Sequence, residues 1–167
     1  VTPALRYESS EVESAKDYGT FDKDALMGGL ALAYDFGNGL SVFGSAAYTE
    51  GLPIIDDLGS SDSARRRMDM SEKSRTYELG AGYTGGNLIA AEDTFSVRGN
   101  FYRTKLWDVT SYIVTGSMST RLEKVETEGF ELEASYGLAN GVYMDLAGHV
   151  SDGTEFNPDG TDAVWQN

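Results

Sequence analysis

Val142-Tyr143-Met144-Asp145-Leu146-Ala147-Gly148-His149-Val150 is the stretch of sequence that decides the fold. Val142, Met144, Leu146 and Val150 would point to one side of a strand, and Tyr143, Asp145 and His149 would point to the other. Successive side chains of a β-strand point to opposite faces of the sheet, so a period of two predicts a strand with one apolar face and one polar face.

The same period recurs along the whole chain. Twenty glycines, ten tyrosines and only three prolines are also typical of a chain with many strands and tight turns. The fold class is therefore predicted to be all-β, with about seven strands. The other six predicted strands lie around residues 5–7, 26–36, 40–48, 77–83, 95–101 and 130–136.

The connections between these strands alternate in length. Long polar connections are expected at 9–23, 51–72 and 108–121, whereas 37–39 and 137–141 are tight and 84–92 is moderate. This alternation predicts an antiparallel up-and-down meander with short turns at one rim and long loops at the other. Transmembrane β-barrels of the bacterial outer membrane have this arrangement, with the long loops outside the cell.

The polar faces of the strands would line a wet lumen, and the apolar faces would meet lipid. A soluble barrel of the lipocalin kind reverses this arrangement, and alternation alone does not say which face is inside. The segregation of long and short loops favours the membrane barrel. The predicted lumen wall contains Arg98, Asn100, Glu131, Glu133, Asp145 and His149, together with Arg6, Glu8 and Glu78.

Aromatic residues on the apolar faces support this orientation, because outer-membrane barrels carry aromatic girdles at both membrane interfaces. An ordinary strand or a soluble core is also rich in aromatic residues, so this indication is the weaker one. The expected girdle near the short turns is Tyr34, Phe36, Tyr83 and Tyr136, and the one near the long loops is Tyr7, Tyr48, Tyr77 and Phe101.

Composition argues against several other classes. The net charge of −14 would repel a nucleic acid, and the absence of cysteine removes thiolate chemistry. The longest apolar stretch, residues 26–33, is too short for a spanning helix. No nucleophile elbow or phosphate-binding loop is present, so we expect neither an enzyme nor a cofactor. Asp56-Asp57 falls short of a calcium site, and one histidine falls short of a zinc site.

Two candidate sites remain. The run Arg65-Arg66-Arg67 could hold an anionic siderophore or lipopolysaccharide phosphates, although a solvated charge run beside acidic neighbours is the simpler interpretation. His149, the single histidine, lies about 13 Å along its strand from Asp145, so the two cannot form a direct pair. We expect His149 to be a hydrogen-bonded residue of the polar wall.

Three motifs resemble the barrel domain of TonB-dependent outer-membrane receptors. Leu40 to Tyr48 followed by Glu50-Gly51-Leu52-Pro53 resembles a barrel strand and its loop. Ser71-Glu72-Lys73-Ser74-Arg75-Thr76-Tyr77-Glu78-Leu79-Gly80 is similar to the family's strand ending in YELG, and Glu128 to Glu133 resembles a later strand. The motifs occur in the family's order and span nearly the whole chain.

The resemblance implies a barrel of about 22 strands that encloses an amino-terminal plug. Seven strands cannot close such a barrel, so residues 1–167 are expected to be a partial barrel domain, an internal piece without plug, TonB-contacting segment or closing strand. The chain opens Val1-Thr2-Pro3 with no visible export signal, which fits a mature or excised segment.

The function implied by the resemblance is import of an iron chelate, of the siderophore or haem type, or of a similarly large nutrient. TonB would supply energy through parts of the parent protein, and lipid and lipopolysaccharide would surround the barrel. The expected haem-binding histidine is missing between Glu50 and Met70, so haem has no ligand here. A passive porin and a soluble lipocalin-like barrel are the alternatives.

Overall fold

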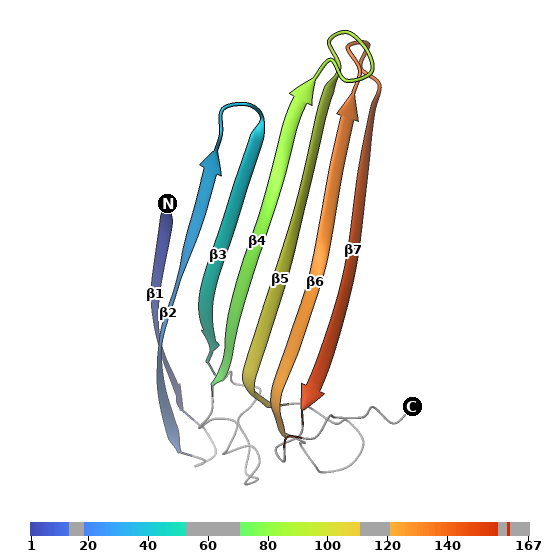
Figure 1. Cartoon of the computed structure of the whole chain (residues 1–167). Coiled ribbons are helices and arrows are strands. Elements are labelled where there is room, and N and C mark those ends of the chain that lie inside the picture. Colours follow the sequence, from blue (N-terminus) through green and yellow to red (C-terminus); the bar gives the residue numbers. More distant parts are fainter. Residues whose placement is uncertain (14–18, 53–70, 111–120, 157–159, 161–167) are drawn as a thin grey trace.

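Seven long β-strands form the molecule in its computed structural model, which describes residues 1–13, 19–52, 71–110, 121–156 and 160 (Figure 1). The number of strands and their positions along the chain confirm the prediction from alternation. The strands are β1 (Thr2–Glu13), β2 (Thr20–Asp35), β3 (Leu40–Gly51), β4 (Glu72–Gly86), β5 (Thr94–Thr110), β6 (Arg121–Gly137) and β7 (Tyr143–Phe156).

The strands build one sheet in chain order, and every neighbouring pair is antiparallel. This is the predicted meander, and it is open, with β1 at one edge and β7 at the other. An open seven-stranded meander is the arrangement expected of part of a larger β-barrel. Among the residues that the structure describes, no helix has the length and hydropathy needed to cross a membrane.

The strands extend further toward the long connections than the sequence pattern predicted. The expected loop at residues 9–23 is wrong in its bounds, because β1 runs on to Glu13 and pairs there with Thr20 of β2. Similarly, β5 continues to Thr110. Neither face of these extensions is uniformly apolar, although they include Val12, Phe21, Leu106 and Trp107, so they lack the apolar alternation of the central strands. Their backbone pairing marks them as strands.

Short turns join the strands at the opposite rim. In the turn between β2 and β3, Gly37 and Gly39 have φ values of 76° and 85°, a backbone region that glycine enters without steric cost. The Asp35 carboxylate accepts a hydrogen bond from the Gly37 N–H at 2.7 Å, and the Asn38 side chain accepts one from the Leu40 N–H at 3.1 Å. Local hydrogen bonds therefore fix this reversal.

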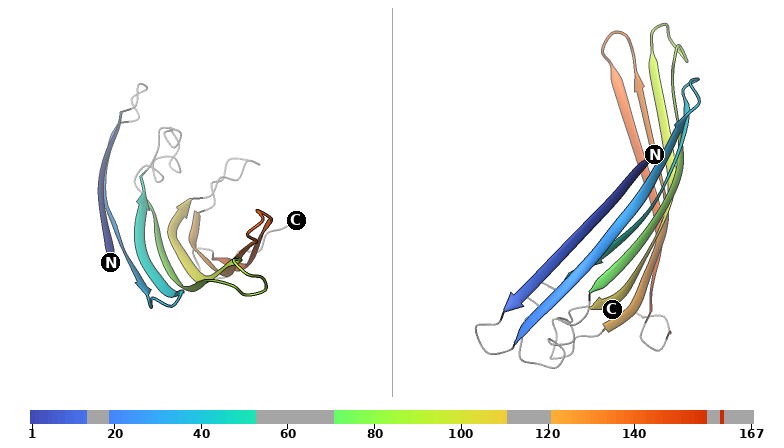
Figure 2. Two further views of the ribbon diagram at one scale, coloured as in Figure 1. Left: turned by 90° about the horizontal axis from the view of Figure 1, so that it is seen from above. Right: turned by 90° about the vertical axis from the view of Figure 1, so that its left-hand side faces the viewer.

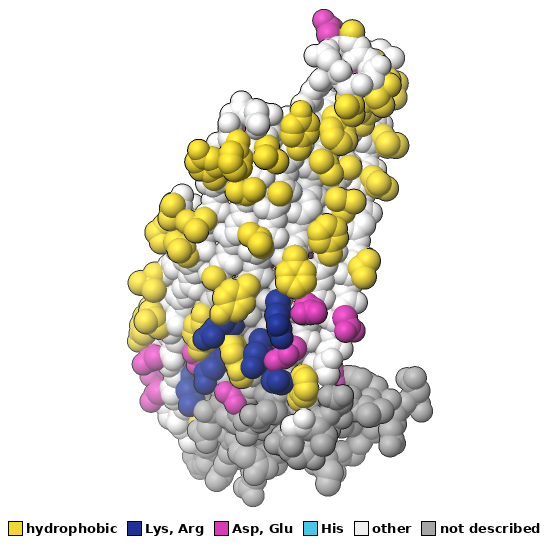
Figure 3. All heavy atoms as spheres, viewed as in Figure 1, with side chains coloured by type: hydrophobic (Ala, Val, Ile, Leu, Met, Phe, Trp, Pro, Cys, Tyr) yellow, Lys and Arg dark blue, Asp and Glu magenta, His cyan; other side chains and the backbone are white. Residues whose placement is uncertain are grey.

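The sheet curves, and the two views in Figure 2 show it as an open arc that would continue into a barrel wall. The face seen in Figure 1 is the convex one, and its upper two thirds are covered with apolar side chains (Figure 3). Leu5 is 80% exposed, Leu79 69% and Leu146 62%. Ala25 and Met27 are the only buried apolar residues among those described, so no apolar core lies on either side of the sheet.

Candidate functional site: the concave polar wall

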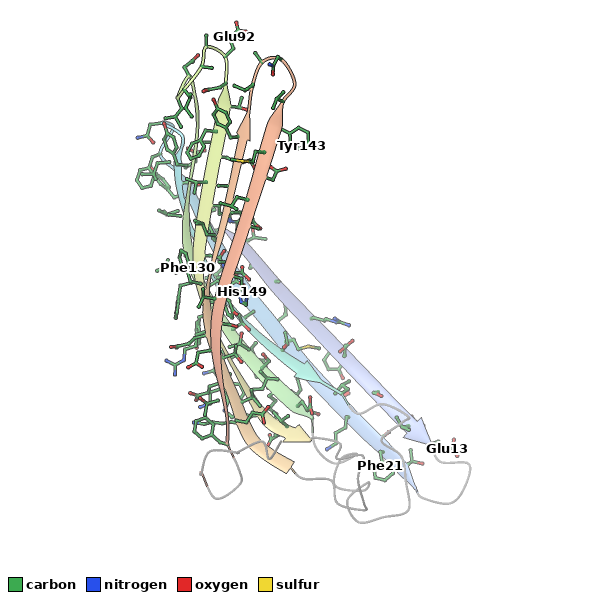
Figure 4. The ribbon with its side chains drawn as sticks, turned by 90° about the vertical axis from the view of Figure 1, so that its right-hand side faces the viewer. Glu13, Phe21, Glu92, Phe130, Tyr143 and His149 are labelled. Atoms are coloured by element: carbon green, nitrogen blue, oxygen red, sulfur yellow. The ribbon has the colours of Figure 1, made fainter. Side chains whose placement is uncertain are left out.

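The side chains predicted to line a lumen share one face of the sheet, and it is the concave one. Asn100, Glu131 and His149 stand directly opposite one another on β5, β6 and β7. The Asn100 side-chain amide donates a hydrogen bond to the Glu131 carboxylate over 3.1 Å. Figure 4 shows His149 and Phe130 on opposite sides of the sheet, as strand alternation requires. These three polar residues form a continuous row across the wall.

His149 has a partner that the sequence did not indicate. Its Nε2 atom lies 2.9 Å from the Tyr102 hydroxyl, and the two rings are stacked with centroids 6.1 Å apart. Tyr102 reaches His149 across Gly129, its directly paired residue on β6. A Cβ added at Gly129 would lie 2.7 Å from the Tyr102 hydroxyl oxygen. The missing side chain of Gly129 therefore makes room for the tyrosine ring.

A second aromatic ring of the wall also lies over a glycine. Phe43 of β3 is paired directly with Gly80 of β4, and its ring occupies the space that a Gly80 side chain would take. The guanidinium carbon of Arg98 lies 4.1 Å from the centre of the Phe43 ring. A cation over an aromatic face is stabilised by the quadrupole of the ring. Arg98 is thus held flat against the wall.

The remaining predicted residues are distributed along the same face. Glu133 stands opposite Arg98 in the register of β5 and β6, and Asp145 stands opposite Ser135. The structure does not bring Asp145 to His149, in keeping with their separation along β7. Arg65, Arg66 and Arg67 lie outside the described residues. No group of three or more carboxylate, histidine or cysteine side chains suited to a metal ion occurs in the described part of the chain.

The short turn between β4 and β5 contains a buried carboxylate that sequence reasoning missed. Asp93 accepts hydrogen bonds from the backbone N–H groups of Leu88, Ile89 and Ala90, each at 2.8 Å. The hydroxyl of Tyr136 donates a fourth at 2.7 Å. The Ala90 N–H is the largest cause that holds the pKa of Asp93 well below its usual range, and it outweighs the opposing effect of desolvation.

A band of charged residues on the convex face was also missed. Arg75 on β4 and Arg103 on β5 each lie one outward position nearer the long connections than Tyr77 and Phe101. The apolar face therefore becomes charged toward the long connections. The alternation continues there with basic instead of apolar residues. Following the same alternate positions past each aromatic residue would have revealed this band from the sequence.

A curved meander that is apolar outside and polar inside is the wall of an outer-membrane type of β-barrel. The model of the family described as TonB dependent receptor-like, beta-barrel matches residues 1–165, and the chain belongs to this family. That family consists of outer-membrane receptors and transporters, as the resemblance had implied. No curated protein matches the chain.

Proposed function

We propose that this chain forms part of the barrel wall and outer loops of a transporter that imports an iron chelate or a similarly large, scarce nutrient. The single observation behind the proposal is the division of the sheet into an apolar convex face and a polar concave face. In this proposal the convex face meets outer-membrane lipid, and the concave face lines the path of the substrate. The parent protein would obtain energy from TonB through segments outside the described strands.

The dimensions of the apolar face support a membrane position. Its outward side chains run from Leu26 on β2 to Phe36, the residue that directly follows this strand. At ~3.4 Å per residue these ten steps cover about 34 Å along the strand, which a tilt of ~45° reduces to about 24 Å. The apolar band of outer-membrane barrels is ~25 Å tall. The face is therefore as tall as the hydrocarbon layer that it would cross.

The concave wall supports passage of a polar solute. Arg98, Asn100, Glu131 and His149 offer charged groups, donors and acceptors along adjacent strands. Arg98 is held by Phe43, His149 is held by Tyr102, and Asn100 is bonded to Glu131. These contacts hold the side chains against the wall and leave the lumen side open to water or to a plug domain. A haem-type substrate receives no support, because the only histidine is engaged with Tyr102 within the wall.

Accessibility in native outer membranes tests the orientation of the two faces. The chain has no cysteine, so single cysteines at Leu79 and Leu132 and at their neighbours Glu78 and Glu131 can each carry a nitroxide without background. We expect labels at the two leucine positions to collide with dissolved oxygen, and labels at the two glutamates with a water-soluble nickel complex. Glutamate labels that meet oxygen and leucine labels that meet nickel would refute the lipid-facing assignment.

Uptake by the full-length protein tests the transport function. The complete reading frame is expressed in a Gram-negative host that makes no siderophore, and entry of ⁵⁵Fe bound to catecholate, hydroxamate and citrate chelators is measured. We expect uptake of at least one chelate, and we expect it to disappear when TonB is deleted. Uptake that persists without TonB would instead indicate a passive porin.

A further inference from the structure

The short turn between β4 and β5 has an apolar tip. The turn reads Asn87-Leu88-Ile89-Ala90-Ala91-Glu92-Asp93, and we name its four consecutive apolar residues, 88–91, the apolar tip. Leu88 is 62% exposed and Ile89 is 80% exposed. Turns that face water are usually built from glycine, proline and small polar residues. The exposed aliphatic pair of this turn therefore departs from the usual composition of a solvated turn.

Most backbone donors of this turn are satisfied within the turn itself. Three consecutive N–H groups, those of Leu88, Ile89 and Ala90, donate to the buried Asp93 carboxylate, each at 2.8 Å. The N–H of Glu92 is bound at 2.8 Å to a side chain of the same turn. Backbone groups that meet lipid must find their partners inside the protein, because hydrocarbon offers no hydrogen bonds. The apolar tip thus combines exposed aliphatic side chains with a backbone that needs little water.

The turn is fastened to the convex face of the sheet. Tyr136 belongs to the outward series of β6, and its hydroxyl donates to the Asp93 carboxylate at 2.7 Å. The group that holds the turn therefore lies on the apolar side of the wall. Figure 4 shows Glu92, the charged residue that follows the apolar tip, at the outermost end of the turn beyond the strands. The apolar tip thus adjoins the apolar face, and charge lies beyond it.

The height of the apolar face places the apolar tip at the edge of the hydrocarbon layer. On β4 the outward apolar series starts at Tyr77, because the outward position before it is the charged Arg75. Within the strand this series ends at Tyr83, and at ~3.4 Å per residue and a tilt of ~45° it is only about 14 Å tall. The apolar band of outer-membrane barrels is ~25 Å tall. Ten steps from Tyr77, the length of the β2 series, end at Asn87, so the turn supplies the missing height.

We propose that the apolar tip inserts Leu88 and Ile89 among the acyl chains of inner-leaflet phospholipids and anchors the β4–β5 hairpin there. Short turns of outer-membrane barrels face the periplasm, so the inner leaflet is the one at this rim. Two aliphatic side chains offer far less than the ~800 Å² that each partner buries in a standard protein interface. A lipid layer has no such minimum area, and a turn held by Asp93 loses little conformational freedom on insertion. The inference rests on the lipid-facing orientation in the proposed function, and not on which nutrient is imported.

Spin labels in the full-length protein, freed of any other cysteine and reconstituted in phospholipid bilayers, test the insertion. Ile89→Cys carries a nitroxide on the apolar tip, and Glu92→Cys carries one in the same turn as the matched control. We expect the Ile89 label to collide mainly with dissolved oxygen and the Glu92 label mainly with a water-soluble nickel complex, so that the ratio of the two collision rates differs several-fold. An Ile89 label that meets nickel as often as the Glu92 label would overturn the inference. A label shielded from both reagents would overturn it too, because it would indicate contact with protein.

Removal of the aliphatic pair tests the anchor without labels. The variant Leu88→Ser/Ile89→Ser is expected to raise the unfolding equilibrium constant in phospholipid vesicles about tenfold or more, because two apolar side chains no longer leave water on folding. The variant Leu88→Val/Ile89→Val keeps most of the apolar surface and should stay close to wild type. In a turn that faces water the serine variant would lose nothing, so equal stability of this variant and wild type would overturn the inference.

Labels on the strands separate failure of the anchor from failure of the proposed function. Lipid contact at Leu79 and Leu132 together with nickel contact at Ile89 would leave the orientation of the sheet intact and refute the anchor alone. Absence of lipid contact at Leu79 and Leu132 would refute the orientation on which the proposed function depends, and the anchor with it. Oxygen contact at all three positions is the result that we expect.

Discussion

The Tyr102 hydroxyl lies 2.9 Å from Nε2 of His149, and the tyrosine ring reaches it by crossing Gly129 on the strand between them. The three residues come from β5, β6 and β7, so their contact depends on the register of three strands. Gly129 lies in the segment from Glu128 to Glu133, which resembles a strand of the family, and Gly80 is the last residue of the YELG motif. In both cases an aromatic ring fills the place of the absent side chain.

We predict that Gly129→Ala destabilises the sheet locally. The new Cβ would lie 2.7 Å from both the Tyr102 hydroxyl oxygen and the Val150 carbonyl oxygen, and the second of these belongs to the backbone and cannot swing away. Forcing an extra methyl group into a packed site typically costs ~1–3 kcal/mol. Urea unfolding of the full-length protein in lipid vesicles would measure the change.

Gly148→Ala is the matched control on the neighbouring strand, because a Cβ there meets nothing within 4 Å in this chain. Its unfolding free energy should equal that of wild type within ~0.5 kcal/mol. Equal losses in the two variants would mean that the alanine itself, and not the contact with Tyr102, weakens the strand.

The Gly80→Ala variant is expected to displace the Phe43 ring and, with it, Arg98. A Cβ at Gly80 would also approach the Gly99 carbonyl oxygen to 2.6 Å. Adding Phe43→Ala to the Gly80→Ala variant should restore part of the lost stability. The second substitution removes the ring but leaves the close contact with the Gly99 carbonyl oxygen. Gly82→Ala, where the nearest atom is the Ser41 Oγ at 3.3 Å, provides the comparison. If Phe43→Ala gave no recovery, the ring would not be the obstacle.

The turn held by Asp93 should make stability depend on pH in a defined direction. The pKa of Asp93 is lowered in the folded state, so its contribution is fully present above the ordinary aspartate pKa of ~3.9 and is lost as pH falls toward the lower folded value. Asp93→Asn cannot ionise. The difference in unfolding free energy between wild type and Asp93→Asn is therefore expected to be constant from pH 7 to about 5 and to shrink below pH 4.

Glu92→Gln is the control for this experiment, because the Glu92 side chain is exposed in the same turn and only its N–H is bound, to the Asn87 side chain. The difference in unfolding free energy between wild type and Glu92→Gln should not shrink below pH 4 in the way expected for Asp93→Asn. A difference between wild type and Asp93→Asn that stays unchanged down to pH 3 would show that the carboxylate is not what holds the turn.

Alternation predicted the seven strands and the partition of residues such as Leu132 and Glu131 between two faces, because side-chain direction is a local property of a strand. It could not predict which face is convex, since a period of two is symmetric and only the curvature of the assembled sheet breaks the symmetry. The contact between Tyr102 and His149, 47 positions apart, required the register of the strands. The strand ends toward the long connections were missed because neither of their faces is uniformly apolar, so a pattern of apolar alternation does not extend to them.

The convex face should reject charge at mid-height. Leu132 lies between Phe130 and Ala134 in the apolar series of β6 and is 39% exposed in this chain. We predict that Leu132→Arg destabilises the full-length protein in lipid vesicles by ~2–4 kcal/mol, the usual cost of arginine facing lipid near the bilayer midplane. Reversible unfolding followed by tryptophan fluorescence measures it.

Ser135→Arg is the matched variant on the concave face of the same strand. Its register partner on β7 is Asp145, so the added guanidinium would meet a carboxylate and water instead of hydrocarbon. We expect the unfolding free energy of this variant to change by less than ~1 kcal/mol, as is usual for exposed charge pairs. Should Leu132→Arg be tolerated while Ser135→Arg unfolds the protein, the apolar face would have to be the interior, and a lipocalin-like barrel would replace the membrane wall.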